Sequence, residues 1–168
     1  MATVEQMCRQ NGPHWIIAQD GEPELRAMYE RHYSCYHYKD GRRPKKFCGP
    51  GQIIPLTLPN RDALFVWRKF KDDSGQTGIN CAVFRNESHY LSSDLIREAD
   101  AIADFCWPCE RHYTYVRAEA IQSRNPGYCF LCAGWKHCGY TKAGLFILER
   151  KERKMKEGDK VDYHAVIG

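Results

Sequence analysis

Three consecutive residues, His32, Tyr33 and Ser34, have side chains that can do acid–base chemistry. A histidine can accept or donate a proton near neutral pH, and a phenol can act as an acid. Side chains of these types could move a proton to or from a bound substrate. We therefore take these residues as catalytic candidates, with Tyr113 and Tyr128 as further candidates for the acid. Ordinary surface or core residues are the alternative.

A second polar group follows the apolar run 79–84, where Arg85, Asn86 and Glu87 stand at the expected end of a strand. Polar side chains at such a point emerge at the edge of a sheet and could hold a small-molecule donor. Ser92 and Ser93 precede a helical pattern, so they can cap the helix or add hydroxyl groups to the same site. A structural turn and a simple cap are the alternative interpretations.

Positive charge is concentrated in one Gly- and Pro-rich loop. The whole chain has a net charge of +4, and residues 39–46, with five cations against Asp40, supply an excess of the same size. Lys and Arg neutralise phosphates, and a Tyr ring can receive an unstacked base. A solvated turn with inward-packed tyrosines is the alternative. The composition predicts DNA contact through Tyr36, Tyr38, Lys39, Arg42, Arg43, Lys45 and Lys46.

Four cysteines, Cys106, Cys109, Cys129 and Cys132, have the C-x2-C-x19-C-x2-C spacing of a structural zinc site. The expected secondary structure argues against zinc. The strand after Cys109 advances about 20 Å at 3.3 Å per residue, and the following short helix recovers only about 9 Å at 1.5 Å per residue. Four thiolates on one zinc lie within about 4 Å of one another. We instead expect Cys129, Cys132 and Cys138 to be small apolar residues in a packed helix and strand.

The elements that must position these residues come in the order strand, helix, three-strand meander, helix, strand, helix and strand hairpin. Strands are expected at 14–18, 53–58, 63–70, 79–84, 113–116 and 145–149. Helices are expected at 22–31, from Ser92 or Ser93 to Pro108, and after Asn125 as cap with Pro126 at the first position. This order predicts an α/β (α+β) fold with a mixed, mainly antiparallel sheet flanked by helices. We expect one domain over residues 1–150 and a charged, flexible tail over residues 151–168.

Cysteine usage and hydropathy bear on the cellular compartment. The chain has nine cysteines, an odd number, which argues against a closed disulfide framework. It has neither a secretory signal nor an apolar run of the roughly 18 residues that cross a bilayer. We expect a cytoplasmic protein with reduced thiols and no membrane partner.

The order of elements resembles the GNAT acyltransferase fold over residues 14–150. Particular motifs resemble bacteriophage DNA-modification proteins of the Mom type: HYS at 32–34, GPGQ at 49–52, INCAVFRNES at 79–88, SSDLIREA at 92–99, RHYTYV at 111–116 and NPGYCFLCAGW at 125–135. The resemblance implies transfer of a group to the exocyclic amine of adenine in DNA, which blocks restriction enzymes in an infected bacterial cell. It also implies an association with iron, in which His32 and Tyr33 would take part.

Two departures from ordinary GNAT enzymes bear on the donor. No glycine lies between Arg85 and Ser93, although close approach of backbone to the pyrophosphate of acyl-CoA favours glycine. Phe130 stands where those enzymes place a catalytic tyrosine, and a phenyl ring cannot transfer a proton. Acyl-CoA is therefore disfavoured and the donor is unidentified. Two other functions stay open: a zinc-stabilised, non-enzymatic nucleic-acid-binding module with an anti-restriction or regulatory role, and a GNAT acyltransferase acting on a small amine or protein.

Overall fold

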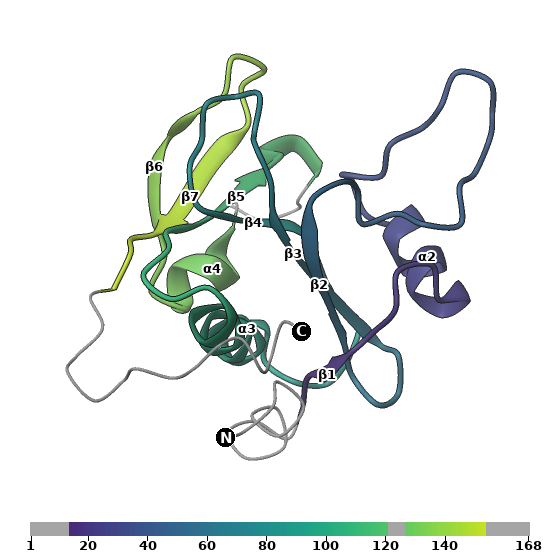
Figure 1. The fold of residues 1–168 in the computed structure, drawn as a ribbon, viewed down its shortest axis with the longest axis horizontal. Coiled ribbons are helices and arrows are strands. Elements are labelled where there is room, and N and C mark those ends of the chain that lie inside the picture. The colour runs from purple at the N-terminus through teal and green to yellow at the C-terminus, as the bar shows by residue number, and fades with distance from the viewer. Residues whose placement is uncertain (1–13, 121–126, 154–168) are drawn as a thin grey trace.

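The computed structural model describes residues 14–120 and 127–153, which form a mixed sheet with helices on both faces (Figure 1). The strands are β1 (Ile16–Ile17), β2 (Gln52–Thr57), β3 (Ala63–Lys69), β4 (Ile79–Asn86), β5 (His112–Val116), β6 (Lys136–Tyr140) and β7 (Phe146–Arg150). The helices are α2 (Pro23–Glu30), α3 (Ser92–Cys106) and α4 (Tyr128–Cys132), with a 3-10 turn, η1, at Ala118–Ala120. The predicted mixed, mainly antiparallel sheet flanked by helices is confirmed. Most of the predicted tail lies outside the described residues.

Strands β4 and β5 in the middle of the sheet separate along part of their length. Its strand order is β1-β2-β3-β4-β5-β7-β6, and the predicted antiparallel meander is formed by β2, β3 and β4. Strands β4 and β5 are parallel, and in the described chain they pair only from Ile79 opposite His112 to Cys81 opposite Thr114. Beyond that point β4 continues beside β3, and β5 continues beside β7. Their facing backbone edges are therefore not joined to each other at this end.

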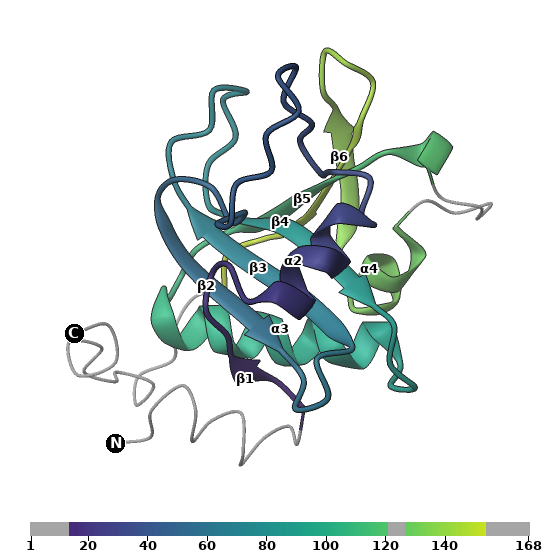
Figure 2. The same ribbon diagram turned by 90° about the vertical axis from the view of Figure 1, so that its right-hand side faces the viewer.

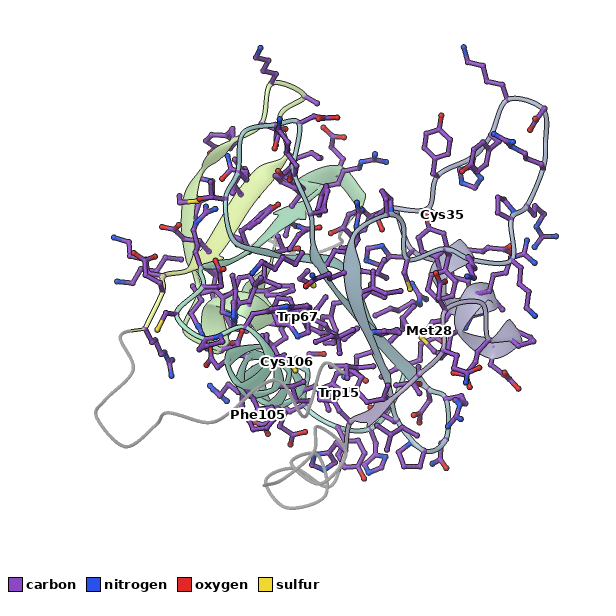
Figure 3. All side chains as sticks on the ribbon, in the orientation of Figure 1. Trp15, Met28, Cys35, Trp67, Phe105 and Cys106 are labelled. Atoms are coloured by element: carbon purple, nitrogen blue, oxygen red, sulfur yellow. The ribbon has the colours of Figure 1, made fainter. Side chains whose placement is uncertain are left out.

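Alternate residues of β3 supply two separate cores. Phe65 and Trp67 pack in the layer beneath α3 and α4, whereas Leu64 and Val66 pack beneath α2. Figure 2 shows α2 and α3 on opposite faces of the sheet, and Figure 3 shows Trp67 on the α3 side and Met28 on the α2 side. Because both faces are covered, β3 is a continuous apolar run and not an alternating one.

Helix α3 begins without a side-chain cap. The residue before the helix is Leu91, so the prediction that Ser92 or Ser93 caps it is wrong. Ser92 Oγ accepts a hydrogen bond from Asn86 Nδ2 at 2.9 Å, and Ser93 is only 6% exposed. The two serines lie in the first turn, and the helix ends at Cys106 as its periodicity predicts.

Helix α4 follows a glycine, Gly127, at a position where a side chain does not fit. Gly127 precedes the helix in the left-handed conformation, with φ of 73°. A Cβ there would lie 2.3 Å from a methyl group of Leu148 on β7. Gly127 thus lets α4 approach the sheet closely. The predicted cap Asn125 and the predicted first residue Pro126 lie outside the described residues.

Three connections project from the same end of the sheet in Figures 1 and 2. They are residues 31–51 between α2 and β2, residues 70–78 between β3 and β4, and residues 141–145 between β6 and β7. The first contains the predicted catalytic triplet and the predicted DNA-binding residues. We call residues 31–51 the basic loop.

Candidate functional site

His32 and Ser34 form a hydrogen-bonded pair at the start of the basic loop. The chain turns tightly after α2, where the backbone N–H of His32 donates to Tyr29 O at 2.9 Å. This turn brings Ser34 Oγ to 2.7 Å from His32 Nδ1, and the Ser34 backbone N–H donates to the same nitrogen at 3.1 Å. A nitrogen that accepts from a backbone N–H carries no proton of its own. The hydroxyl of Ser34 is therefore the donor to His32, and the imidazole proton lies on Nε2.

The surroundings of His32 keep its ring neutral. Burial lowers the pKa of His32 to about 4, and the positive charge of Arg85 acts in the same direction. A hydrogen bond to the Phe84 carbonyl opposes the shift without reversing it. At neutral pH the ring is thus unprotonated and a weak base, and its Nδ1 lies next to the exposed Ser34.

Tyr33 reaches the place where β4 and β5 part. Its hydroxyl donates to the backbone O of Tyr115 at 3.1 Å, just beyond the last paired residues of the two strands. Burial raises the pKa of Tyr33 above its ordinary value, and the thiols of Cys81 and Cys129 add to the shift. The ring centroid is 4.2 Å from that of His32. Tyr33 therefore stays protonated, binds backbone and supports the histidine ring.

The candidates for donor binding divide into two groups, and the first lies beside His32. Glu87 accepts two hydrogen bonds from Arg31, at 3.1 and 2.7 Å, and a third from Arg85. Arg85 also donates to the backbone O of Arg31 at 3.0 Å. Hydrogen bonds from Arg31 and Arg85 lower the pKa of Glu87 to about 2. Arg31 was missed by sequence analysis, because its partners are distant along the chain.

The second group holds the β4–α3 connection in place. Asn86 Oδ1 accepts from the backbone N–H and the hydroxyl of Ser88, at 2.9 and 2.5 Å. Asn86 Nδ2 donates to Tyr90 O at 2.7 Å and to Ser92 Oγ at 2.9 Å. These contacts use both donors and both lone pairs of the amide. In this structure Asn86 and Ser92 stabilise the turn, and the buried Ser93 is not presented to a ligand.

The two other tyrosine candidates are placed elsewhere. Tyr113 is fully buried and donates to Asp72 Oδ2 at 2.7 Å, and Tyr115 donates to the same oxygen at 2.7 Å. The shared partner places both rings on one face of β5. Tyr128 is 59% exposed on α4, and a hydrogen bond with Cys132 raises its pKa. Among the described contacts, neither Tyr113 nor Tyr128 meets His32.

The basic loop and α2 enclose a pocket of 780 Å³. Ser34 lines this pocket, so the residue whose hydroxyl donates to His32 borders the same space as the cationic side chains. Lys39 and Lys45 do not line it. The predicted DNA-binding residues on its wall are Tyr36, Tyr38, Arg42, Arg43 and Lys46.

Arg68 also lines the pocket, although it comes from β3 and was not predicted. Its Nε donates to the backbone O of Pro50 at 3.1 Å, and its guanidinium lies 3.7 Å from the centroid of the Phe70 ring. Burial lowers the pKa of Arg68 from its ordinary value. Sequence alone gave no signal for Arg68, because a cation near the end of a strand is equally often exposed to solvent.

A buried polar cluster on the opposite face was also missed. Asp100 Oδ1 lies 2.8 Å from His112 Nδ1, and Asp100 Oδ2 accepts from Trp135 Nε1 at 2.9 Å. Arg150 pairs with Asp104 beside them. His112 is fully buried, so this cluster joins α3, β5 and β7 inside the core and is not open to a substrate.

The cysteines of the zinc alternative differ in their surroundings. Cys106 is buried, Cys129 is half-buried, and Cys109 and Cys132 are exposed. The prediction that Cys132 and Cys138 are packed is wrong, since both are exposed, whereas Cys129 does pack against the core. Across residues 14–120 and 127–153, no group of three or more His, Cys, Asp or Glu residues is arranged to hold a metal ion.

The proposed iron ligands likewise do not form such a group. His32 Nδ1 accepts from Ser34, and the Tyr33 hydroxyl donates to Tyr115.

The described residues also include no helix with the length and apolar character to span a membrane. Comparison with protein-family models, with curated proteins and with solved structures found no match for this chain.

Proposed function

We propose that this protein transfers a group from a small-molecule donor to the exocyclic amine of adenine in DNA. The observation that carries the proposal is the position of Ser34, which lines the cationic pocket and donates to His32 at 2.7 Å. A proton acceptor and a surface suited to nucleic acid therefore share one opening. Such a site suits a substrate whose reacting amine belongs to a phosphate-bearing polymer.

The arrangement of the sheet supports a GNAT-like scaffold. A meander leads into α3, then into the parallel strand β5 that parts from β4, and then into α4 and the β6–β7 hairpin. This is the order that the GNAT resemblance implies. Two Mom-type motifs, HYS at 32–34 and INCAVFRNES at 79–88, also lie close together. Arg85 of the second motif contributes to the lowered pKa of His32 in the first. The scaffold and the meeting of these motifs favour adenine in DNA over a small amine or a protein as the acceptor.

The chemistry can be written with the residues of this chain. The adenine nitrogen attacks the electrophilic carbon of an activated acyl-type donor, forming a C–N bond while the leaving group departs with its electron pair. The nitrogen loses a proton to Ser34 Oγ as the serine proton passes to His32 Nδ1. A weak base is sufficient here, because an N–H becomes strongly acidic once its nitrogen has attacked. Arg85, whose positive charge acts on His32, is the cation that we assign to the developing negative charge.

The β4–α3 connection does not offer the usual cradle for acyl-CoA. It has no glycine between Arg85 and Ser93, and the amide of Asn86 is fully used within it. A donor without a pyrophosphate would not need that cradle. The proposal therefore specifies an activated acyl-type donor and no particular carrier.

Mass spectrometry of nucleosides from DNA of cells that express the protein tests the proposal. We expect an adenine nucleoside of increased mass with the wild type and not with His32→Ala. Arg97→Gln is the matched control, since Arg97 is an exposed cation on α3 that pairs with Asp94. Unmodified nucleosides with the wild type, together with intact DNA binding, would replace the enzyme with a binding module.

A further inference from the structure

We infer that the pocket beneath the basic loop binds one unpaired nucleotide, with its phosphate at Arg68 and its base against Tyr36. The substrate strand would then be single-stranded or locally opened DNA. This inference rests on the proposed function only for the identity of the polymer. The site itself follows from the size, the charges and the aromatic rings of the pocket.

The size of the pocket suits a nucleotide. Its volume of 780 Å³ lies inside the range of about 300–1,000 Å³ that small-molecule sites occupy. A duplex cannot enter such a space, since both strands would have to pass beneath one loop. A single extruded nucleotide can enter a space of this size, and Ser34 is part of its wall.

The ion pairs on the pocket wall leave two of its cations available for an anion. Arg26 and Arg43 pair with Glu30, and Arg42 pairs with Asp40. Among the described residues, no carboxylate forms an ion pair with the two other cations on the wall, Arg68 and Lys46.

Arg68 is also held in place before any ligand arrives. Its Nε is fixed by Pro50 O at 3.1 Å, and its guanidinium packs on Phe70 at 3.7 Å. The backbone at Gly49 approaches so closely that a Cβ there would lie 2.9 Å from Arg68 Nη1. The charge of Asp72 acts on Arg68 from beyond ion-pair distance, so the half-buried, positioned guanidinium keeps its free N–H groups for a phosphate.

One aromatic ring on the pocket wall is available for a base. Arg42 already covers the Tyr38 ring at 4.2 Å, and Tyr36 meets that ring edge-on at 76°. Tyr36 is 68% exposed, and its backbone N–H donates to the Tyr29 hydroxyl at 2.9 Å. The Tyr29 ring in turn stacks on Phe47, so Tyr36 is anchored to α2. Stacked neighbours occupy both faces of a base inside duplex DNA, so such a base must leave the stack before it can lie against Tyr36.

Fluorescence anisotropy with the full chain tests this site. The probe is a labelled single-stranded oligonucleotide, compared with a blunt duplex of the same sequence. We expect the single strand to bind about tenfold more tightly than the duplex, and Tyr36→Leu to remove most of this difference. Arg68→Gln should weaken single-strand binding and make it less sensitive to salt. Arg97→Gln should change neither property.

Two results would overturn the inference: equal affinity for duplex and single strand, or wild-type binding by both Tyr36→Leu and Arg68→Gln. Tyr36 is exposed, so its substitution tests the site even if Arg68→Gln disturbs the fold. The two proposals fail separately. DNA that is modified without a single-strand preference would overturn this site alone, and a single-strand preference without any modified nucleoside would overturn the transferase alone.

Discussion

Ser34 Oγ lies 2.7 Å from His32 Nδ1, and of these two residues only Ser34 lines the pocket. The histidine sits behind it, half-buried and neutral because burial lowers its pKa to about 4. The serine hydroxyl is therefore the path between a substrate in the pocket and the base.

Removing this path should reduce modification without unfolding the protein. We expect Ser34→Ala and His32→Ala each to lower the yield of modified nucleoside by about 10²-fold, the size of a general acid–base contribution. Ser34→Thr keeps a hydroxyl and should retain most of the yield. A wild-type yield from Ser34→Ala would show that the base receives its proton by another route.

The lowered pKa of His32 predicts how stability depends on pH. The unfolded chain binds a proton near pH 6.5 and the folded chain only near pH 4, so stability is complete above pH 6.5 and falls as the pH drops toward 4. The loss should be on the order of 1–2 kcal/mol after allowance for partial exposure. Urea midpoints at pH 7.5, 6 and 5 would measure it.

His32→Gln should flatten this dependence. The measurements should not go below pH 5. The arginine partners of Glu87 lower its pKa from 4.5 to about 2, so its contribution to stability is lost as the pH falls from about 4.5 toward 2. Measurements in that range would mix the two effects. An unchanged slope in His32→Gln would contradict the assignment.

Asp100 should be a strong determinant of stability. Asp100→Ala would leave His112 Nδ1 and Trp135 Nε1 buried without an acceptor. Breaking one partner out of a buried charged network costs about 3–5 kcal/mol. Asp94→Ala, at an exposed position on the same helix, should cost less than about 0.5 kcal/mol. Equal urea midpoints for the two variants would refute this role.

Gly127 and Gly144 offer a matched pair for testing the contact between α4 and β7. Both have positive φ, but a Cβ at Gly127 would lie 2.3 Å from Leu148, whereas one at Gly144 would meet nothing within 4 Å. Gly144→Ala should cost about 1–2 kcal/mol for backbone strain alone. Gly127→Ala should cost more, by about 1–3 kcal/mol for overpacking. Thermal unfolding of both variants would separate the two contributions, and equal losses would mean that α4 moves to accommodate the methyl group.

Local pattern alone determined most of the elements and the basic loop. The apolar runs over β2, β3 and β4, separated by turn residues, predicted the meander, and helical periodicity predicted α3 up to Cys106. These features depend on residues that are near one another in the chain. The loop also needed only its composition, since Gly and Pro exclude regular structure and the cations are adjacent.

Tertiary structure alone decided which polar residues meet. It placed Ser92 inside the first turn of α3 and not at the cap position, which Leu91 occupies. Asn86, at the end of the preceding strand, donates a hydrogen bond to Ser92. It set Tyr113 against Asp72 and Arg68 beside the pocket. Hydrogen bonds and ion pairs between residues that are distant in sequence depend on how strands pair and helices pack, and residue types alone do not encode that geometry.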